Sequence, residues 1–159
     1  MNRRAELTVA VDVDAPAEVV WRAVTDWPGQ RAWMLATRVE VLGDGDGRHR
    51  GARLRAVTGY GPLSFTDPMQ ILEWDPPRRC VVGHLGALVR GDGVFEVVPL
   101  RPGRSQLLWS ERLELPMGAF GAVAWLLVRP LVRIGVRCSL ARLARLCAAQ
   151  AAAGGVRNG

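Results

Sequence analysis

The feature that most constrains the fold is a run of strand-sized segments between residues 36 and 115, separated by short turns rich in Gly, Pro and Asp. Apolar and polar residues alternate within these segments, which is typical of strands with one buried face. The turn residues between them favour direct reversals of the chain. The run therefore predicts a meander of six antiparallel strands, at about 37–42, 52–58, 64–74, 79–85, 89–99 and 106–115.

A strand and short helices are predicted before this run. Residues 5–13 alternate apolar and polar side chains, which indicates a half-buried strand. Pro16, with the acidic Glu18 close behind it, marks a helix start, so a helix is expected over about 16–25. Trp27-Pro28-Gly29 interrupts it, and one more helical turn is expected near residues 30–34.

A long helix is predicted at the end of the chain. After Pro116 the composition changes to Ala, Leu, Val and Arg through about Ala153, which is typical of helices. Pro130 would remove a helical hydrogen bond, so we expect a kink or break between about Val128 and Gly135. Residues 1–153 are predicted to form one domain, followed by a flexible Gly-rich tail over 154–159.

Composition allows one core without disulfides, metals or cofactors. A chain of 159 residues buries roughly 70% of its unfolded surface, and 49% hydrophobic residues exclude a disordered chain. The three cysteines form no C-x-x-C pair and have no His at ligand spacing, so we interpret them as reduced thiols. The start of a calcium-binding loop is similar to Asp44-Gly45-Asp46-Gly47. However, Arg48 occupies the next ligand position, and no Glu follows at the distance needed for a bidentate ligand, so this segment is predicted to be a turn.

The positive charge is concentrated in the predicted C-terminal helix. All 21 basic residues are Arg, and no acidic residue follows Glu114. A solvated helix face is the simplest interpretation, and contact with an anionic membrane is the alternative. The sequence has no basic helix-turn-helix or aromatic-basic strand motif, so nucleic acid is not an expected partner. The candidate membrane contacts are Arg129, Arg133, Arg137, Arg142 and Arg145.

No targeting or membrane-spanning segment is apparent. Arg3 and Arg4 are not followed by an apolar signal core. The longest uncharged apolar stretch, Leu115 to Val128, has 14 residues, fewer than the roughly 20 needed to span a bilayer. The sequence therefore predicts a cytoplasmic protein.

The element order and several short motifs resemble one family. The order strand, two short helices, six strands and long helix is that of a helix-grip fold, and the motifs are similar to those of the SRPBCC superfamily, in its polyketide cyclase/dehydrase and lipid-transport branch. The motifs are Asp14-Ala15-Pro16-Ala17-Glu18-Val19-Val20-Trp21, Asp26, Trp33, Asp75-Pro76-Pro77-Arg78, Leu115-Pro116-Met117-Gly118 and Ser139-Leu140 with Leu143. The resemblance implies an α+β fold: a curved antiparallel sheet of about seven strands wraps round the long helix and leaves an internal cavity for a hydrophobic small molecule. It carries over no catalytic residues.

Three titratable residues lie on strand faces whose other residues are mostly apolar, and they are the candidate catalytic residues. Glu111 shares a strand face with Leu107, Trp109 and Leu113; Asp67 shares one with Met69; and His84 shares one with Val82. If they converge, His84 could shuttle a proton and a desolvated Asp67 or Glu111 could act as acid or base. The competing interpretation is ordinary ion pairing at the rim with Arg53, Arg55 or Arg90. His49 lies in the Gly/Asp loop and is expected to be solvated.

Three functions are compatible with this sequence. The first is non-catalytic binding or carriage of a hydrophobic molecule such as a lipid, polyketide or quinone. The second is a polyketide cyclase or dehydratase using the three titratable residues, which convergence of at least two of them inside the cavity would favour. The third is an accessory protein that docks on an anionic membrane. The predicted ligand-binding residues are Phe65, Met69, Phe95, Val97, Trp109 and Glu111, and the inner face of the last helix is expected to complete the cavity wall. Trp21, Trp27 and Trp33 are expected to pack helices on the sheet.

Overall fold

The computed structural model describes residues 3–87, 89–115 and 118–156. Each predicted strand is present, with its ends within two residues of the prediction. The elements in chain order are β1 (Arg3–Val13), α1 (Ala17–Val24), the 3-10 helix η1 (Pro28–Ala32), β2 (Thr37–Leu42), β3 (Arg53–Thr58), the 3-10 helix η2 (Gly61–Leu63), β4 (Phe65–Asp75), β5 (Arg79–Leu85), β6 (Arg90–Arg101), β7 (Arg104–Leu115) and α2 (Gly118–Val156).

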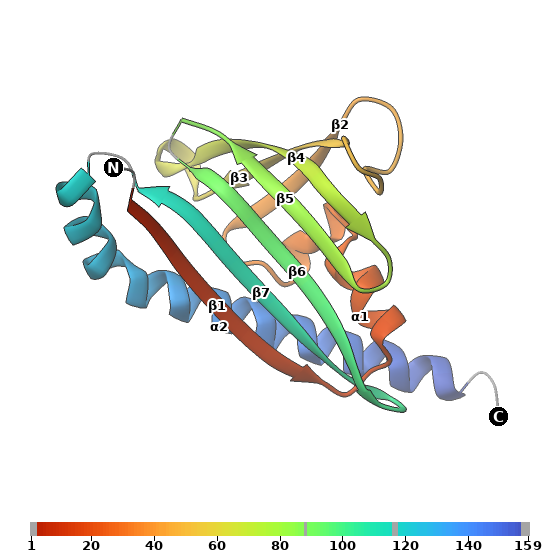
Figure 1. The fold of residues 1–159 in the computed structure, drawn as a ribbon. Coiled ribbons are helices and arrows are strands. Elements are labelled where there is room, and N and C mark those ends of the chain that lie inside the picture. Colours follow the sequence, from red (N-terminus) through yellow and green to blue (C-terminus); the bar gives the residue numbers. More distant parts are fainter. Residues whose placement is uncertain (1–2, 88, 116–117, 157–159) are drawn as a thin grey trace.

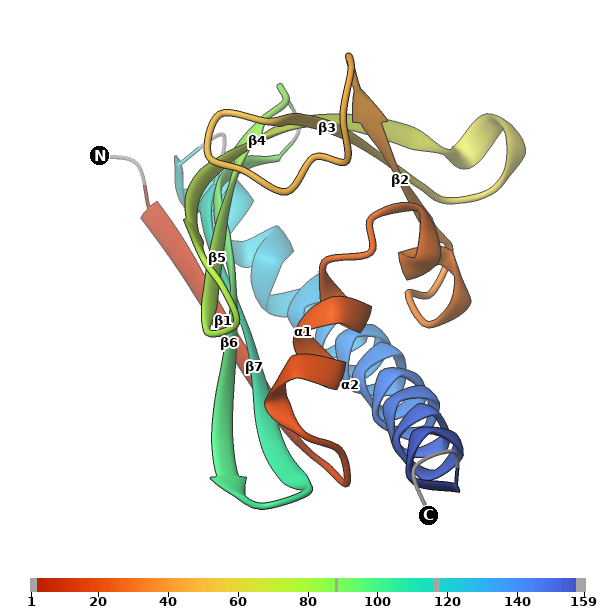
Figure 2. The ribbon, with the colours of Figure 1, turned by 90° about the vertical axis from the view of Figure 1, so that its right-hand side faces the viewer.

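The strands form one antiparallel sheet of seven strands in the order β1-β7-β6-β5-β4-β3-β2. Strands β2 to β7 are therefore a meander, and β1 pairs with β7 to extend it. The sheet curves strongly, and α1 and α2 lie on its concave side (Figure 2). Figure 1 shows α2 crossing the sheet behind β1 and β7. The predicted α+β helix-grip fold is confirmed.

The core lies between the concave face, α1 and the second half of α2. Leu140, Leu143 and Cys147 of α2 are buried against it. Trp21 of α1 packs on Trp74 of β4, with ring centroids 5.1 Å apart. Burial of the aromatic rings at this contact fixes α1 on the sheet.

The two other tryptophans of this region are also buried. The indole Nε1 of Trp27 donates a hydrogen bond to the carbonyl oxygen of Gly47, 3.0 Å away. This bond fixes the position of the loop that follows β2. Trp33 meets Trp109 of β7 edge to face, with ring centroids 6.1 Å apart. Trp27 and Trp33 thus connect the η1 region to the sheet.

Of the kink or break predicted for the last helix, the break is absent. Helix α2 continues through Pro130, although its first turns run at an angle to the remainder (Figure 1). Pro130 lies on the exposed side of the helix. Because proline has no backbone N–H, one carbonyl group of the preceding turn lacks its helical donor, and water can donate a hydrogen bond to it there. The helix also ends at Val156 instead of Ala153, and residues 157–159 of the predicted tail lie outside the described residues.

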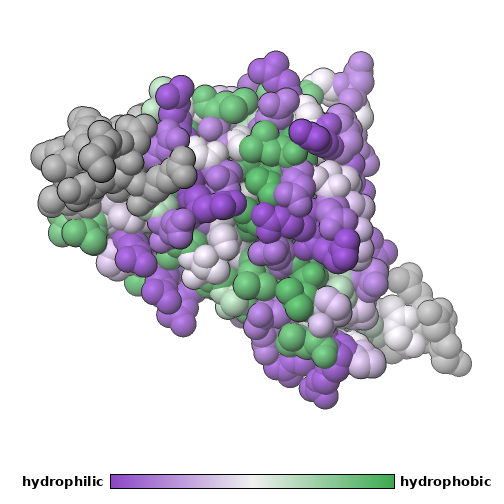
Figure 3. Space-filling view, in the orientation of Figure 1, coloured by the Kyte–Doolittle hydropathy of each residue, from purple (hydrophilic) through white to green (hydrophobic). Residues whose placement is uncertain are grey.

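The convex face of the sheet carries mostly hydrophilic side chains with scattered apolar ones (Figure 3). Arg79 of β5 bridges Glu73 of β4 and Glu96 of β6 there, at 3.1 and 2.9 Å. Within the described part of the chain, no helix combines the length and hydropathy of a membrane-spanning segment.

Candidate functional site

A cavity of about 560 Å³ lies between the concave face of the sheet, the η1 region and the first half of α2. The structure places five of the six predicted ligand-binding residues on its wall: Phe65, Met69, Phe95, Trp109 and Glu111. Val97 is the exception and does not line it. This residue lies further along β6, buried in the core at the end of the sheet that α1 covers.

Helical residues complete the wall. Met34 and Gln30 contribute from the η1 region, and Trp125, Val132 and Val136 contribute from α2. Strand alternation could not identify these residues, because the rotation of a helix over a sheet is set by tertiary packing. The apolar composition of the segment after Pro116 was the available signal, but composition does not say which turns of the helix face a cavity and which face the core.

Asp67, His84 and Glu111 meet inside this cavity. They come from β4, β5 and β7, and strand alternation turns all three side chains to the concave face. Their side chains are 8, 12 and 16% exposed, respectively. Three titratable groups are thus collected in an otherwise mostly apolar space.

The three groups form a continuous hydrogen-bonded chain with Trp109. His84 Nδ1 lies 2.5 Å from Asp67 Oδ2, and His84 Nε2 lies 3.2 Å from Glu111 Oε2. The other oxygen of Glu111 accepts a hydrogen bond from Trp109 Nε1 at 2.6 Å. Each carboxylate is therefore held in place by a donor from a neighbouring residue.

The pKa of His84 is raised from its ordinary value of 6.5 to about 10. Burial alone would lower it, but the hydrogen bonds to Asp67 and Glu111 and the charges of these carboxylates outweigh the burial. At neutral pH the ring is accordingly an imidazolium, in which both nitrogens carry hydrogen. One cation thus lies between two carboxylates.

A gap in the side chains of β6 makes the contact between β5 and β7 possible. Strand β6 runs between them, and Gly93 on β6 pairs with Glu111. A Cβ atom at position 93 would lie only 3.1 Å from Glu111 Oε1. The sequence Gly91-Asp92-Gly93 predicts only a strand entry or bulge, whereas glycine at position 93 gives the Glu111 carboxylate the room to cross β6.

Gly91 has a different, structural role. Its φ of +129° is a conformation that favours glycine, and a Cβ there would lie 1.9 Å from the Arg112 carbonyl oxygen. This position therefore demands glycine for the backbone of β6 to approach β7.

The rim ion pairs considered as the alternative do not form. Asp67 and Glu111 both pair with His84, whereas Arg55 pairs with Glu40 on the neighbouring strand β2. Arg90 lines the cavity. His49 is exposed on the loop between β2 and β3 and takes no part in the site.

Among the described residues, no three His, Cys, Asp or Glu side chains are arranged to hold a metal ion. Asp67, His84 and Glu111 are linked to one another by hydrogen bonds through the His84 ring.

Comparison with known families agrees with this architecture. Residues 4–148 match the family described as polyketide cyclase / dehydrase and lipid transport. The chain belongs to this family. The match covers all seven strands and most of α2, so the polyketide cyclase/dehydrase fold spans nearly the whole protein. No curated protein matches the chain in sequence at a significant level.

Solved structures of low sequence identity share the same fold as this polyketide cyclase/dehydrase family member. The ZhuI aromatase/cyclase from Streptomyces sp. R1128 superposes with a TM-score of 0.75 at 20% identity, over 91% of this chain and 94% of that one. A protein from Thermus thermophilus has a TM-score of 0.75 at 21% identity, over 92% and 99%. Norcoclaurine synthase from Thalictrum flavum has a TM-score of 0.64 at 19% identity, over 92% and 96%.

Proposed function

We propose that this protein binds a hydrophobic small molecule in the cavity and catalyses an acid–base step on it, of the cyclisation or dehydration type. One observation carries the proposal, namely the convergence of Asp67, His84 and Glu111 in a largely apolar cavity. The sequence alone favoured binding or carriage. A carrier needs one orienting polar group, whereas three linked titratable groups are typical of acid–base catalysis.

Glu111 is the proposed base. Trp109 and His84 each occupy one lone pair on a different oxygen of its carboxylate, and a carboxylate has about four such sites. Lone pairs therefore remain for a proton from a bound molecule. The two donors fix the carboxylate in one orientation, which is what a positioned base requires.

His84 is the proposed acid, and Asp67 positions it. The 2.5 Å contact with Asp67 holds the ring through Nδ1, whereas the contact of Nε2 with Glu111 is longer, at 3.2 Å. The Nε2 hydrogen is thus the less tightly held of the two, and it lies on the side of Glu111. A ligand oxygen near Glu111 can accept it.

These roles combine into a balanced dehydration of a β-hydroxy carbonyl compound. Glu111 removes the proton from the carbon next to the carbonyl group, and the released electron pair forms a carbon–carbon double bond. The C–O bond to the hydroxyl group breaks, and this oxygen takes the Nε2 proton of His84 and leaves as water. The proton on Glu111 then returns to His84 through their hydrogen bond, which restores both groups.

The walls suit an extended, planar, hydrophobic substrate. Trp109 packs beside Phe95, with ring centroids 5.2 Å apart, and both line the cavity with Met69 and Val82. Aromatic faces bind flat conjugated rings through stacking and apolar burial. Polyketide-like substrates that become aromatic on dehydration fit this chemistry.

Non-catalytic carriage remains the second candidate, because the cavity wall is mostly apolar. In that case Glu111 would orient a ligand hydroxyl group without removing a proton. The two functions share the cavity and the ligand class, and they differ in whether the bound molecule is converted.

The test uses aryl β-hydroxy ketones, whose dehydration gives a conjugated product that is followed by absorbance. Binding is measured separately by quenching of tryptophan fluorescence. Glu111→Gln should lower the turnover about 100-fold or more while binding changes only modestly. Glu6→Gln, which removes an exposed carboxylate from β1, is the matched control and should keep both properties. Ligands that bind the unchanged protein tightly but are never converted would contradict catalysis and favour carriage.

A further inference from the structure

The first half of α2 has two apolar sides, of which only one is covered. Trp125, Val132 and Val136 line the cavity from this helix. On the opposite side, four large apolar residues are between 58 and 74% exposed: Leu126, Leu127, Leu131 and Ile134. Residues 127, 131 and 134 are spaced at one helical turn, so their side chains form a continuous stripe.

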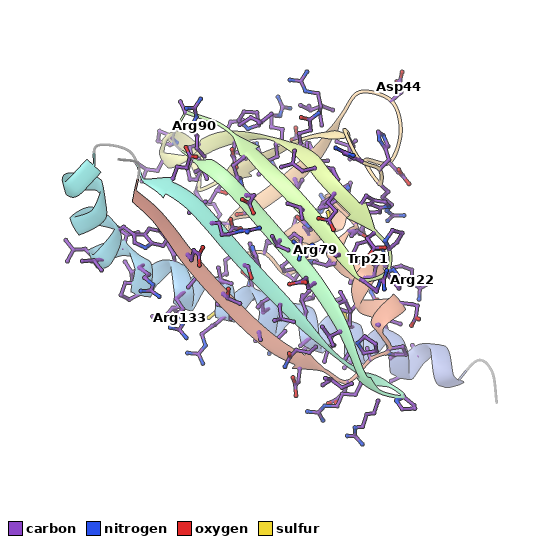
Figure 4. The ribbon with its side chains drawn as sticks, in the orientation of Figure 1. Trp21, Arg22, Asp44, Arg79, Arg90 and Arg133 are labelled. Carbon is purple, nitrogen blue, oxygen red and sulfur yellow. The ribbon has the colours of Figure 1, made fainter. Side chains whose placement is uncertain are left out.

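Arginines border this exposed stripe on one side. Arg129, Arg133 and Arg137 are exposed on the same turns of α2, and no acidic residue follows Glu114 in the sequence. In Figure 4, Arg133 lies on α2 at the lower edge of the molecule, well apart from Arg90 at the upper edge. We call residues 126–137 of this outer surface, with their leucines and arginines, the α2 outer face.

We propose that the α2 outer face docks on an anionic membrane surface. The leucines and Ile134 would enter the boundary between headgroups and acyl chains, and the three arginines would contact the lipid phosphates. An apolar helix side bordered by Arg is the pattern of helices that lie in a membrane interface, and Arg side chains reach the headgroup level while their stems stay in apolar surroundings.

Charge complementarity favours a membrane over the other occupants of such a surface. A second copy of the chain, paired helix to helix about a two-fold axis, would bring the arginines of one copy against those of the other. An acidic protein would satisfy the arginines but would leave four large apolar side chains to be matched as well. An anionic bilayer matches both kinds of side chain, since its negative headgroups attract the arginines and the acyl chains beneath them bury the apolar side chains.

Docking in this way would place the cavity beside the lipid. The same turns of α2 separate the cavity from the outer surface, with Val132 and Val136 inside and Leu131 and Ile134 outside. A hydrophobic ligand dissolved in the membrane would then reach the cavity over a short path. This inference rests on α2 alone and holds whether the bound molecule is converted or only carried.

The test is co-sedimentation of the full chain with vesicles of phosphatidylglycerol mixed with phosphatidylcholine. Leu131→Gln combined with Arg133→Gln should weaken binding by tenfold or more, since one arginine near the surface contributes about fivefold and the leucine adds to it. Leu100→Gln combined with Arg101→Gln is the matched control, because both residues are exposed at the far end of β6. This control should bind like the unchanged protein, and salt should weaken binding in both.

Three outcomes would overturn the inference: equal binding by the two double variants, equal binding to pure phosphatidylcholine vesicles, or no binding at all. A mass twice that of the chain in solution, lost in the Leu131→Gln and Arg133→Gln variant, would assign the α2 outer face to self-association instead. Turnover of a water-soluble substrate should be the same in both double variants. Failure of membrane binding is therefore distinguishable from failure of the proposed catalysis.

Discussion

Trp109 donates its indole hydrogen to Glu111, two residues away on the same face of β7, with Nε1 and Oε1 2.6 Å apart. The bond fixes the carboxylate from one side while His84 holds it from the other. One strand therefore supplies both the proposed base and the group that orients it. A hydrogen bond to a charged group contributes about 1.5–3 kcal/mol.

Trp109→Phe should therefore lower turnover more than it weakens binding. The phenyl ring preserves the apolar wall, but the Glu111 carboxylate loses a donor, and we expect roughly a tenfold or greater loss of kcat. Trp33→Phe is the matched control: Trp33 is buried and its Nε1 has no hydrogen-bond partner among the described residues. Equal kcat values for the two variants would show that the indole donor does not matter.

Gly93→Ala should separate Glu111 from His84 while the protein remains folded. The new Cβ atom would lie 3.1 Å from Oε1 and 3.3 Å from Oε2 of Glu111, so the carboxylate must move. Its hydrogen bond to His84 then weakens, and the pKa of His84 should fall. A histidine titration followed by NMR measures this fall, and an unchanged pKa would contradict the role assigned to Gly93.

The free energy of unfolding should decrease with rising pH between about pH 6.5 and pH 10. Burial opposes the charged form of His84, but its bonds to Asp67 and Glu111 raise the folded pKa to about 10, above the ordinary 6.5. Because the folded state holds the proton more tightly, this stabilisation is complete below pH 6.5 and is lost as the pH rises through the folded pKa.

Urea unfolding at a series of pH values measures this decrease, and His84→Asn should remove it. The buried thiols of Cys80 and Cys147 also have raised pKa values, about 12 and about 11, because of burial. Their contribution begins only near the ordinary thiol value of 9.0, so the slope below pH 9 reports His84. Identical slopes in the two proteins over that range would disprove the assignment.

Trp21→Ala should destabilise the protein by about 3–5 kcal/mol, because it removes a large buried side chain. Trp21 packs on Trp74 and fixes α1 on the sheet. Tyr60→Ala, a truncation of an aromatic side chain that is 76% exposed, should change stability by no more than about 0.5 kcal/mol. Thermal or urea unfolding compares the two, and a Trp21→Ala protein of full stability would contradict the packing described here.

Local patterns in the sequence were sufficient to predict most of the fold and the strand face on which each site residue lies. The alternation of apolar and polar residues predicted that Asp67, His84 and Glu111 lie on the apolar faces of their strands, because side chains alternate between the two faces with a period of two residues. Alternation could not predict how the three would meet, since that depends on strand order and on the missing side chain at Gly93.

The remaining differences arise from packing between distant segments. Val97 lies on the same face of β6 as Phe95, which lines the cavity, but α1 covers the end of β6 at which Val97 lies. Pro130 was expected to kink or break α2, and no break occurs, because a proline on an exposed helix side costs one hydrogen bond while the neighbouring turns continue. The exposure of Leu127 and Leu131 depends on how α2 is rotated over the sheet, which no local pattern determines.

The most direct test of the proposed acid is the ¹⁵N NMR titration of the His84 ring. Both ring nitrogens of His84 should carry hydrogen at pH 7, and the ring should lose one of these protons only near pH 10. Glu111→Gln should lower the pKa of His84, because it removes a charge and weakens a hydrogen bond. A neutral His84 ring at pH 7 would contradict the account, since no acid would then be in place.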